Sequence, residues 1–215
     1  MGDWIQLLTV RQIEENGMVK TKRAGDWVSV GKQTALLWVT EGTARYADNS
    51  IPNTLPPGSG MVVPPGTPLP DRLSELPQLE VMFADSISLP FPYTLLWDGV
   101  THLRLEKVQA AFNLLHTWQV VCPLVVYDVL AKDVGTDADR EYTKTVIRDL
   151  RVPLYQSGLV WLKRCADTDR LVANWQQQTG EPRLAFLRAL YVEQPLICPL
   201  PYTWTVKDGK DQYAD

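Results

Sequence analysis

A stretch rich in Pro, Gly, Asn and Ser divides this sequence into two parts of different character. Residues 48–60 read DNSIPNTLPPGSG and show no apolar periodicity. Proline fixes φ and lacks a backbone N–H, so neither a helix nor a strand ladder continues through such a segment. The sequence therefore predicts a small module over residues 1–48, a linker over 49–60, a larger domain over 61–206 and a charged tail over 207–215.

The first part reads as a small β-rich module. Its apolar residues alternate around two turn signals, Asn16-Gly17 and Ala24-Gly25-Asp26, and such dipeptides favour chain reversals between antiparallel strands. The segment KQTALLWVTEG then predicts a short helix that stops near Gly42, and TARYA predicts a closing strand.

The second part alternates apolar runs with amphipathic segments, which is typical of a sheet whose strands are joined by helices. The expected strands are MVVPPG, LEVMFAD, TLLWDG, VVCPLVVYDVL, SGLVWLKR and PLICPLP. The expected helices are PLPDRLSEL, EKVQAAFNLLHTW, REYTKTVIRDL, DTDRLVANWQQQ and PRLAFLRALY. The predicted fold class is α/β, with a mixed, mostly parallel sheet flanked by helices.

Composition removes several classes of function. The formal net charge is −4 and the basic residues are scattered, so we expect no nucleic-acid partner. No apolar span approaches the roughly twenty residues that cross a bilayer, and no basic-then-apolar segment opens the chain. We therefore expect a cytoplasmic protein without a membrane partner. Cys122, Cys165 and Cys198 show no CxxC spacing, which favours buried, reduced thiols.

The stretch TLLWDGVT resembles the metal-binding motif of nucleotide-sugar glycosyltransferases of the GT-A fold, a Rossmann-type α/β fold. In that family "LYLDxDT" ends a strand, and its two aspartates hold Mg²⁺ or Mn²⁺ against the diphosphate of the nucleotide-sugar donor. Asp98 matches the first aspartate and Thr101 the residue after the second, but Val100 replaces the second carboxylate. Valine offers no oxygen to a hard cation. His102 is a candidate substitute ligand, and an exposed histidine at a strand end is the alternative.

A second stretch, LYQSGLVWLKR, resembles the "FNSGVxxxRR" strand of the same family, which lines the acceptor side of the cleft. The resemblance implies that Gln156, Ser157 and Gly158 bind substrate. A small Ser-Gly pair lets a ligand approach the backbone, and glutamine both donates and accepts hydrogen bonds. The alternative is an ordinary loop before a strand.

A third stretch, WQQQTGEPRLAFLRALY, resembles "DQPALxxAL" at the start of a helix that closes the active site. The resemblance implies a catalytic role for Glu181, while capping of the helix by this carboxylate is the alternative. Further along, Trp204 is a candidate to stack on a sugar, with core packing as the alternative. Asp85, near a strand end, is expected to meet the ribose or base of the donor.

The first part resembles small SH3-like modules of bacteriophage head and neck proteins, through the "GDxVxV" pattern carried by Gly25, Asp26, Val28 and Val30. Two functions stay open. One is a phage-encoded glycosyltransferase that moves a sugar from a nucleotide-sugar to an acceptor in the host cytoplasm. The other is a catalytically degenerate glycosyltransferase fold used as a head, neck or decoration protein of the virion, with copies of itself or capsid and neck proteins as partners.

Overall fold

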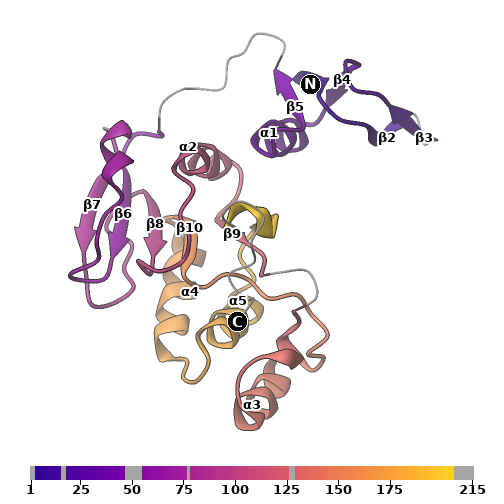
Figure 1. Ribbon diagram of the computed structural model, residues 1–215. Helices are drawn as coiled ribbons and strands as arrows, with labels where there is room; N and C mark the ends of the chain where they lie inside the picture. The colour runs from indigo at the N-terminus through magenta and orange to yellow at the C-terminus, as the bar shows by residue number, and fades with distance from the viewer. Residues whose placement is uncertain (1–2, 16–17, 47–54, 77, 126–128, 206–215) are drawn as a thin grey trace. The chain divides into compact units, whose positions relative to one another are not determined.

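The structure is a computed structural model, and it describes residues 3–15, 18–46, 55–76, 78–125 and 129–205 (Figure 1). The chain divides into two compact units, Met1–Thr54 and Leu55–Asp215. The division falls inside the predicted linker. Residues 49–54 of that linker, the predicted turn at Asn16-Gly17 and the charged tail lie outside the described residues.

The N-terminal unit is β-rich with one short helix, as the sequence predicts. Its elements are β1 (Asp3–Leu7), β2 (Arg11–Glu15), β3 (Met18–Lys22), β4 (Trp27–Val30), α1 (Lys32–Thr40) and β5 (Ala44–Tyr46). The strands form a three-stranded antiparallel sheet, β4-β1-β5, and a separate hairpin of β2 and β3. Its core contains Ile5, Leu7, Val28, Ala35 and Val39.

The second unit is built on a six-stranded sheet in the order β11-β9-β10-β8-β6-β7. The strands are β6 (Ser59–Val63), β7 (Glu80–Phe83), β8 (Tyr93–Trp97), β9 (Val120–Pro123), β10 (Leu159–Lys163) and β11 (Ile197–Leu200). The helices are α2 (Leu105–Leu114), α3 (Asp137–Ile147), α4 (Ala166–Gln177) and α5 (Pro182–Glu193), with 3₁₀ helices η1 (Asp71–Glu75), η2 (Ala131–Asp133) and η3 (Tyr202–Trp204). Neighbouring strands are parallel except where β10 pairs with β8 and β9. The predicted α/β, mostly parallel sheet is therefore confirmed.

Three details of the prediction are wrong. Ser59 and Gly60 belong to β6 rather than to the linker, because Gly60 leaves room for the ring of Phe91 to pack against its backbone. The long strand expected through VVCPLVVYDVL ends at Pro123, since proline cannot donate to a ladder. The helix expected over PLPDRLSEL is only the 3₁₀ turn η1.

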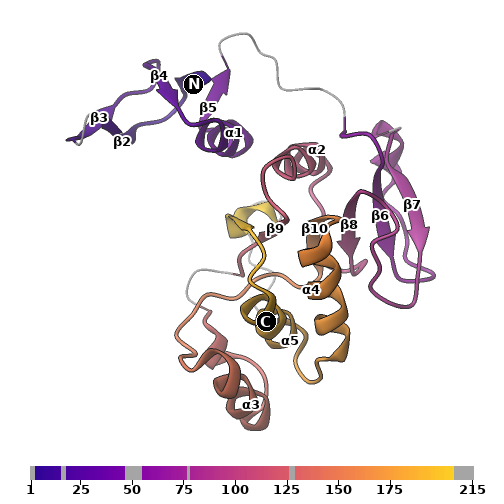
Figure 2. The ribbon, with the colours of Figure 1, turned by 180° about the vertical axis from the view of Figure 1, so that it is seen from behind.

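Helices α4 and α5 pack on one face of the sheet (Figure 2). The core on this face combines Val62, Leu96, Val120, Val160 and Leu162 from the strands with Leu171, Trp175 and Phe186 from the two helices. Strand residues alternate between faces, so the buried Leu95 and Trp161 point to the opposite side. The cysteines are free, as expected; Cys122 and Cys198 are buried, and burial raises the pKa of the Cys122 thiol.

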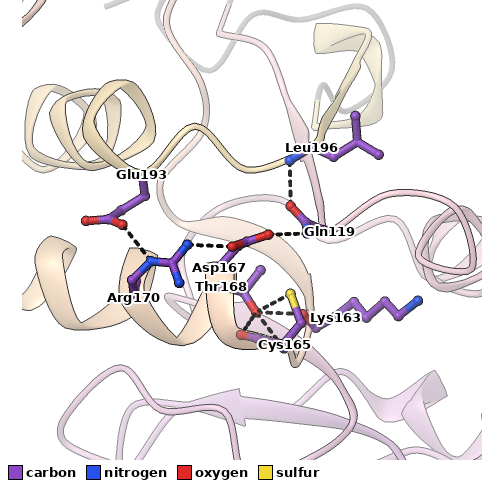
Figure 3. A network of polar contacts seen from close by, with 8 residues as sticks. All are labelled: Gln119, Lys163, Cys165, Asp167, Thr168, Arg170, Glu193 and Leu196. Carbon is purple, nitrogen blue, oxygen red and sulfur yellow. Dashed lines mark hydrogen bonds and ion pairs between the residues drawn. The ribbon is translucent and has the colours of Figure 1, made fainter.

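A polar network ties α4 and α5 to the starts of β9 and β11 (Figure 3). The Gln119 side chain donates to Asp167 at 2.6 Å and accepts from the backbone N–H of Leu196 at 2.7 Å. Arg170 bridges Asp167 and Glu193, at 2.5 and 3.3 Å. The hydrogen bond from Gln119, followed by that from Arg170, lowers the pKa of Asp167. The network fixes the edge of the sheet at which these strands begin.

Among the helices of the described residues, none combines the length and apolar character that a bilayer span requires.

Candidate functional site

The carboxyl edge of the sheet, where β6, β7, β8 and β9 end, gathers segments that lie far apart in the sequence. Strand β10 is antiparallel to β8, so it begins at this edge: Leu159 pairs with Trp97, and the N–H of Asp98 donates to the carbonyl of Gly158 at 2.9 Å. Helix α4 then runs back from the far end of β10, and α5 starts near the same edge. The topology therefore brings the segments of Asp98, Ser157 and Glu181 together.

These segments line one cavity, which we call the polar pocket. Its volume is about 300 Å³, and it is lined by Asp98, Val100, Thr101, Gln156, Ser157, Gly158, Glu181, Pro182 and Arg183. Five residues named as site candidates from the sequence are therefore neighbours in space: Asp98, Gln156, Ser157, Gly158 and Glu181.

A second cavity, the apolar pocket, adjoins the first and shares Asp98 and Ser157 with it. Its volume is about 240 Å³, and its lining is Val62, Val63, Pro64, Ala84, Asp85, Ser86, Ile87, Leu96, Trp97, Asp98, Ser157 and Trp175. Asp85, expected near the donor, lies in this lining with an exposed side chain. We refer to these two neighbouring pockets together as the cleft.

The carboxylate of Asp98 is engaged by its own loop. Oδ1 accepts from the N–H groups of Val100 and Thr101 at 2.9 and 2.7 Å, and Oδ2 accepts from the Thr101 hydroxyl at 2.8 Å. The indole N–H of Trp97 donates to the Thr101 carbonyl at 2.7 Å and closes the loop from the other side. The first role that the structure shows for Asp98 is to hold the loop of residues 98–101.

The residues around Asp98 do not fit a divalent metal. Val100 is 83% exposed at the tip of the loop and offers no oxygen. His102 is half-buried and outside the lining of the polar pocket. Within the described residues no group of three or more His, Cys, Asp or Glu side chains is placed to hold an ion. Mg²⁺ and Mn²⁺ need several oxygen ligands, so the metal set that the resemblance implies is not assembled here.

Gly158 is required by a close approach, but the approaching group is part of the protein. A Cβ at this position would lie 1.9 Å from Oδ2 of Asp98 and 2.5 Å from the hydroxyl oxygen of Thr101. On the side where a Cβ would stand, Asp98 and Thr101 occupy the space beside Gly158, while the residue still lines the polar pocket. Neighbouring Ser157 is half-buried and lines both pockets.

Glu181 is the N-cap of α5. Its Oε2 accepts from the N–H of Leu184 at 2.8 Å, and its Oε1 accepts from Nε of Arg183 at 2.5 Å. Both side chains of the ion pair are mostly buried, with exposed fractions of 15% for Glu181 and 24% for Arg183. The capping alternative is thus present in the structure, and it leaves the carboxylate in the lining of the polar pocket.

The turn before Glu181 is braced from α3 and α5. Arg188 is fully buried and donates to Gln178 at 2.8 Å, to the Thr179 carbonyl at 2.5 Å and to the Thr143 hydroxyl at 2.8 Å. Burial lowers the pKa of Arg188. These bonds hold the turn, and with it the start of α5, in a defined position.

Helix α3 adds a second support through Asp139. Its carboxylate accepts from the N–H and hydroxyl of Thr136 at 3.0 and 2.8 Å, and the backbone N–H of Glu181 also donates to it. These hydrogen bonds, those from Thr136 above all, lower the pKa of Asp139.

Two candidates have other surroundings than expected. Trp204 lies in η3, is 3% exposed and is covered by the Lys107 ammonium 5.4 Å from its ring centre; it lines neither pocket, so stacking on a sugar is wrong and core packing is right. Gln156 does line the polar pocket but is 6% exposed.

Sequence reasoning missed Arg183 and Trp175. The sequence does contain one indication that Arg183 is unusual: it stands at the second position of α5, where the helix dipole disfavours a cation. It contains no such indication for Trp175, because a tryptophan on the apolar face of α4 looks the same in sequence whether it fills a core or borders a pocket.

The chain matches no protein-family model, and comparison with curated proteins and with solved structures found no match either.

Proposed function

We propose that the unit Leu55–Asp215 is a glycosyltransferase-like domain that binds a sugar at the carboxyl edge of its sheet. One observation carries the proposal: the three stretches that resemble the family line the polar pocket together, although they are far apart in the sequence. Ligands of open α/β sheets bind in the crevice outside the carboxyl ends of the strands. The apolar pocket next to it suits a nucleoside: the ring of Trp175 can contact the base, and the carboxylate of Asp85 can accept hydrogen bonds from the ribose hydroxyls.

The activity that follows from the resemblance is transfer of a sugar from a nucleotide-sugar to an acceptor. Glu181 is then the candidate base, and Gln156 and Ser157 contact the acceptor. Calorimetry with common nucleotide-sugars, with and without Mn²⁺, tests binding, and release of free sugar from the donor tests turnover.

A matched pair of variants on α5 sharpens the test. Glu181→Gln keeps an oxygen that can cap the helix but cannot take a proton, and we expect turnover to fall by about 10²-fold or more with donor affinity kept. Glu193→Gln removes a carboxylate at the other end of the same helix and should leave turnover unchanged. Absence of binding by every common donor removes the proposal.

A second candidate function is a catalytically degenerate domain that serves as a structural component of a phage virion. The observation that favours it is the use of both candidate carboxylates in the fold, Asp98 by its loop and Glu181 by the cap and Arg183. The N-terminal unit, proposed to be SH3-like, is then the docking module. Light scattering on the purified chain distinguishes the two: assembly into large homomeric particles supports the structural role, and a small species that turns over a donor supports the enzyme.

A further inference from the structure

The loop after β8 is built so that Asp98 shapes it from within. A carboxylate has about four acceptor positions, and three of those of Asp98 are filled by the N–H groups of Val100 and Thr101 and by the Thr101 hydroxyl. The backbone of Gly158 packs against the same carboxylate so closely that a methyl group has no room between them. Asp98 is thus fixed by contacts on two sides and acts on the pocket through the loop that it holds.

The charges around the cleft point to the kind of ligand that it accepts. Its lining carries three carboxylates, Asp85, Asp98 and Glu181, and one guanidinium, Arg183. Arg183 is paired with Glu181 at 2.5 Å, and the lining of the two pockets together carries three carboxylates against this one guanidinium, so its formal charge is negative. Like charges repel, so these carboxylates disfavour an anionic ligand. A diphosphate in this cleft would lack the metal ion that usually offsets such repulsion.

Uncharged hydroxyl groups suit this lining better. Carboxylates accept hydrogen bonds from hydroxyls, and the glutamine and serine side chains of the pocket both donate and accept. The polar pocket has a volume of about 300 Å³, which is at the small end of ligand sites, roughly 300–1,000 Å³, so one or two sugar rings match its size.

We infer that the polar pocket binds an uncharged saccharide without a divalent cation, and that Asp98 is a positioning residue that holds the loop of residues 98–101 rather than a metal ligand. The inference rests on the proposed sugar binding and restricts the class of ligand to uncharged saccharides. It replaces the metal-bridged donor of the resemblance with a neutral ligand recognised by hydrogen bonds alone.

Backbone amide NMR spectra of the full chain test it with three separate probes: Mn²⁺ alone, a panel of neutral mono- and disaccharides, and nucleoside diphosphates. We expect Mn²⁺ to cause no selective broadening of the Thr101 and Gly158 signals. At least one neutral saccharide should shift the signals of Ser157, Gly158 and Arg183, equally with and without EDTA. Nucleoside diphosphates should bind more weakly than that saccharide.

Two variants separate a positioning residue from a metal ligand. Asp98→Asn keeps the size and an acceptor oxygen for the loop N–H groups, so saccharide affinity should stay within about threefold, while Asp98→Ala removes the loop contacts and should lower it roughly tenfold. A metal ligand would behave differently, because asparagine would then lower affinity as strongly as alanine. The amide spectra of both variants report whether the rest of the sheet is intact.

The possible failures are distinguishable. Selective Mn²⁺ broadening that Asp98→Asn abolishes, or binding of a nucleotide-sugar only with Mn²⁺, overturns the inference and supports the proposed glycosyltransferase. Tighter binding of a nucleoside diphosphate in EDTA than of any neutral saccharide also overturns it. If no saccharide and no nucleotide-sugar shifts any signal of the cleft, the inference and the proposed function both fail.

Discussion

Replacing Gly158 with alanine tests whether Asp98 and Gly158 form one packed unit. The new methyl carbon would lie 1.9 Å from Oδ2 of Asp98. The exposed carboxylate must then turn toward solvent and lose its three hydrogen bonds to the loop. Exposed hydrogen bonds of this kind contribute roughly 0.5–1 kcal/mol each. We therefore expect Gly158→Ala to reduce the free energy of unfolding of the second unit by about 2 kcal/mol.

Scanning calorimetry on the full chain measures this change, and for a unit of this size it corresponds to a fall in Tm of about 4–8 °C. A double-mutant cycle with Asp98→Ala identifies the cause. Without the carboxylate, the Thr101 hydroxyl is free to rotate, so Gly158→Ala should cost less than about 0.5 kcal/mol in that background. Gly31→Ala, in the N-terminal unit, is the control for the added methyl group, since a Cβ there meets nothing within 4 Å, and it should leave unfolding of the second unit unchanged. A destabilisation of equal size in both backgrounds refutes the claim that Asp98 and Gly158 form one packed unit.

Three further predictions concern the scaffold around the cleft. Gly60→Ala should destabilise by about 1–3 kcal/mol in urea unfolding, because its Cβ would lie 2.1 Å from the ring of buried Phe91. Arg188→Met should cost about 2–4 kcal/mol by leaving three acceptors without a donor, and an unchanged melting curve would contradict the proposed brace. The lowered pKa of Asp167 predicts stability that is present above the unfolded pKa and lost as pH falls through the folded pKa. The loss of unfolding free energy caused by Gln119→Leu should therefore become smaller as the pH is lowered. Urea unfolding of both proteins at a series of pH values measures this.

The elements of the fold were predictable where a local pattern sufficed. Apolar runs and helical spacing place β8, β10, α2, α4 and α5 correctly. Strand direction was not predictable, because the buried strand β10 reads the same whichever way it runs. Its antiparallel pairing with β8 depends on tertiary contacts across the sheet, and no periodicity encodes them.

The family resemblance named five residues that the structure places in one pocket lining, Asp98, Gln156, Ser157, Gly158 and Glu181, but it did not reveal their contacts. Nothing in the letters TLLWDGVT distinguishes a carboxylate offered to a metal from one bonded to Thr101. The same holds for Glu181, whose position before Pro182 suits both an N-cap and a catalytic acid. Hydrogen-bond partners decide between such roles, and they depend on backbone geometry that a one-dimensional pattern lacks.

At the carboxyl edge of the sheet, some residues have a clear structural role, while two other features have none. Asp98 satisfies loop N–H groups, Gly158 makes room for Asp98, and Glu181 caps α5, so packing alone accounts for all three. Packing does not account for a cavity left open between them, nor for a cation, Arg183, at the end of a helix where the dipole disfavours it. Glu181 offsets that cation while leaving both side chains in the lining of the cavity. The open space and this ion pair are therefore the features of the carboxyl edge that the fold alone does not explain.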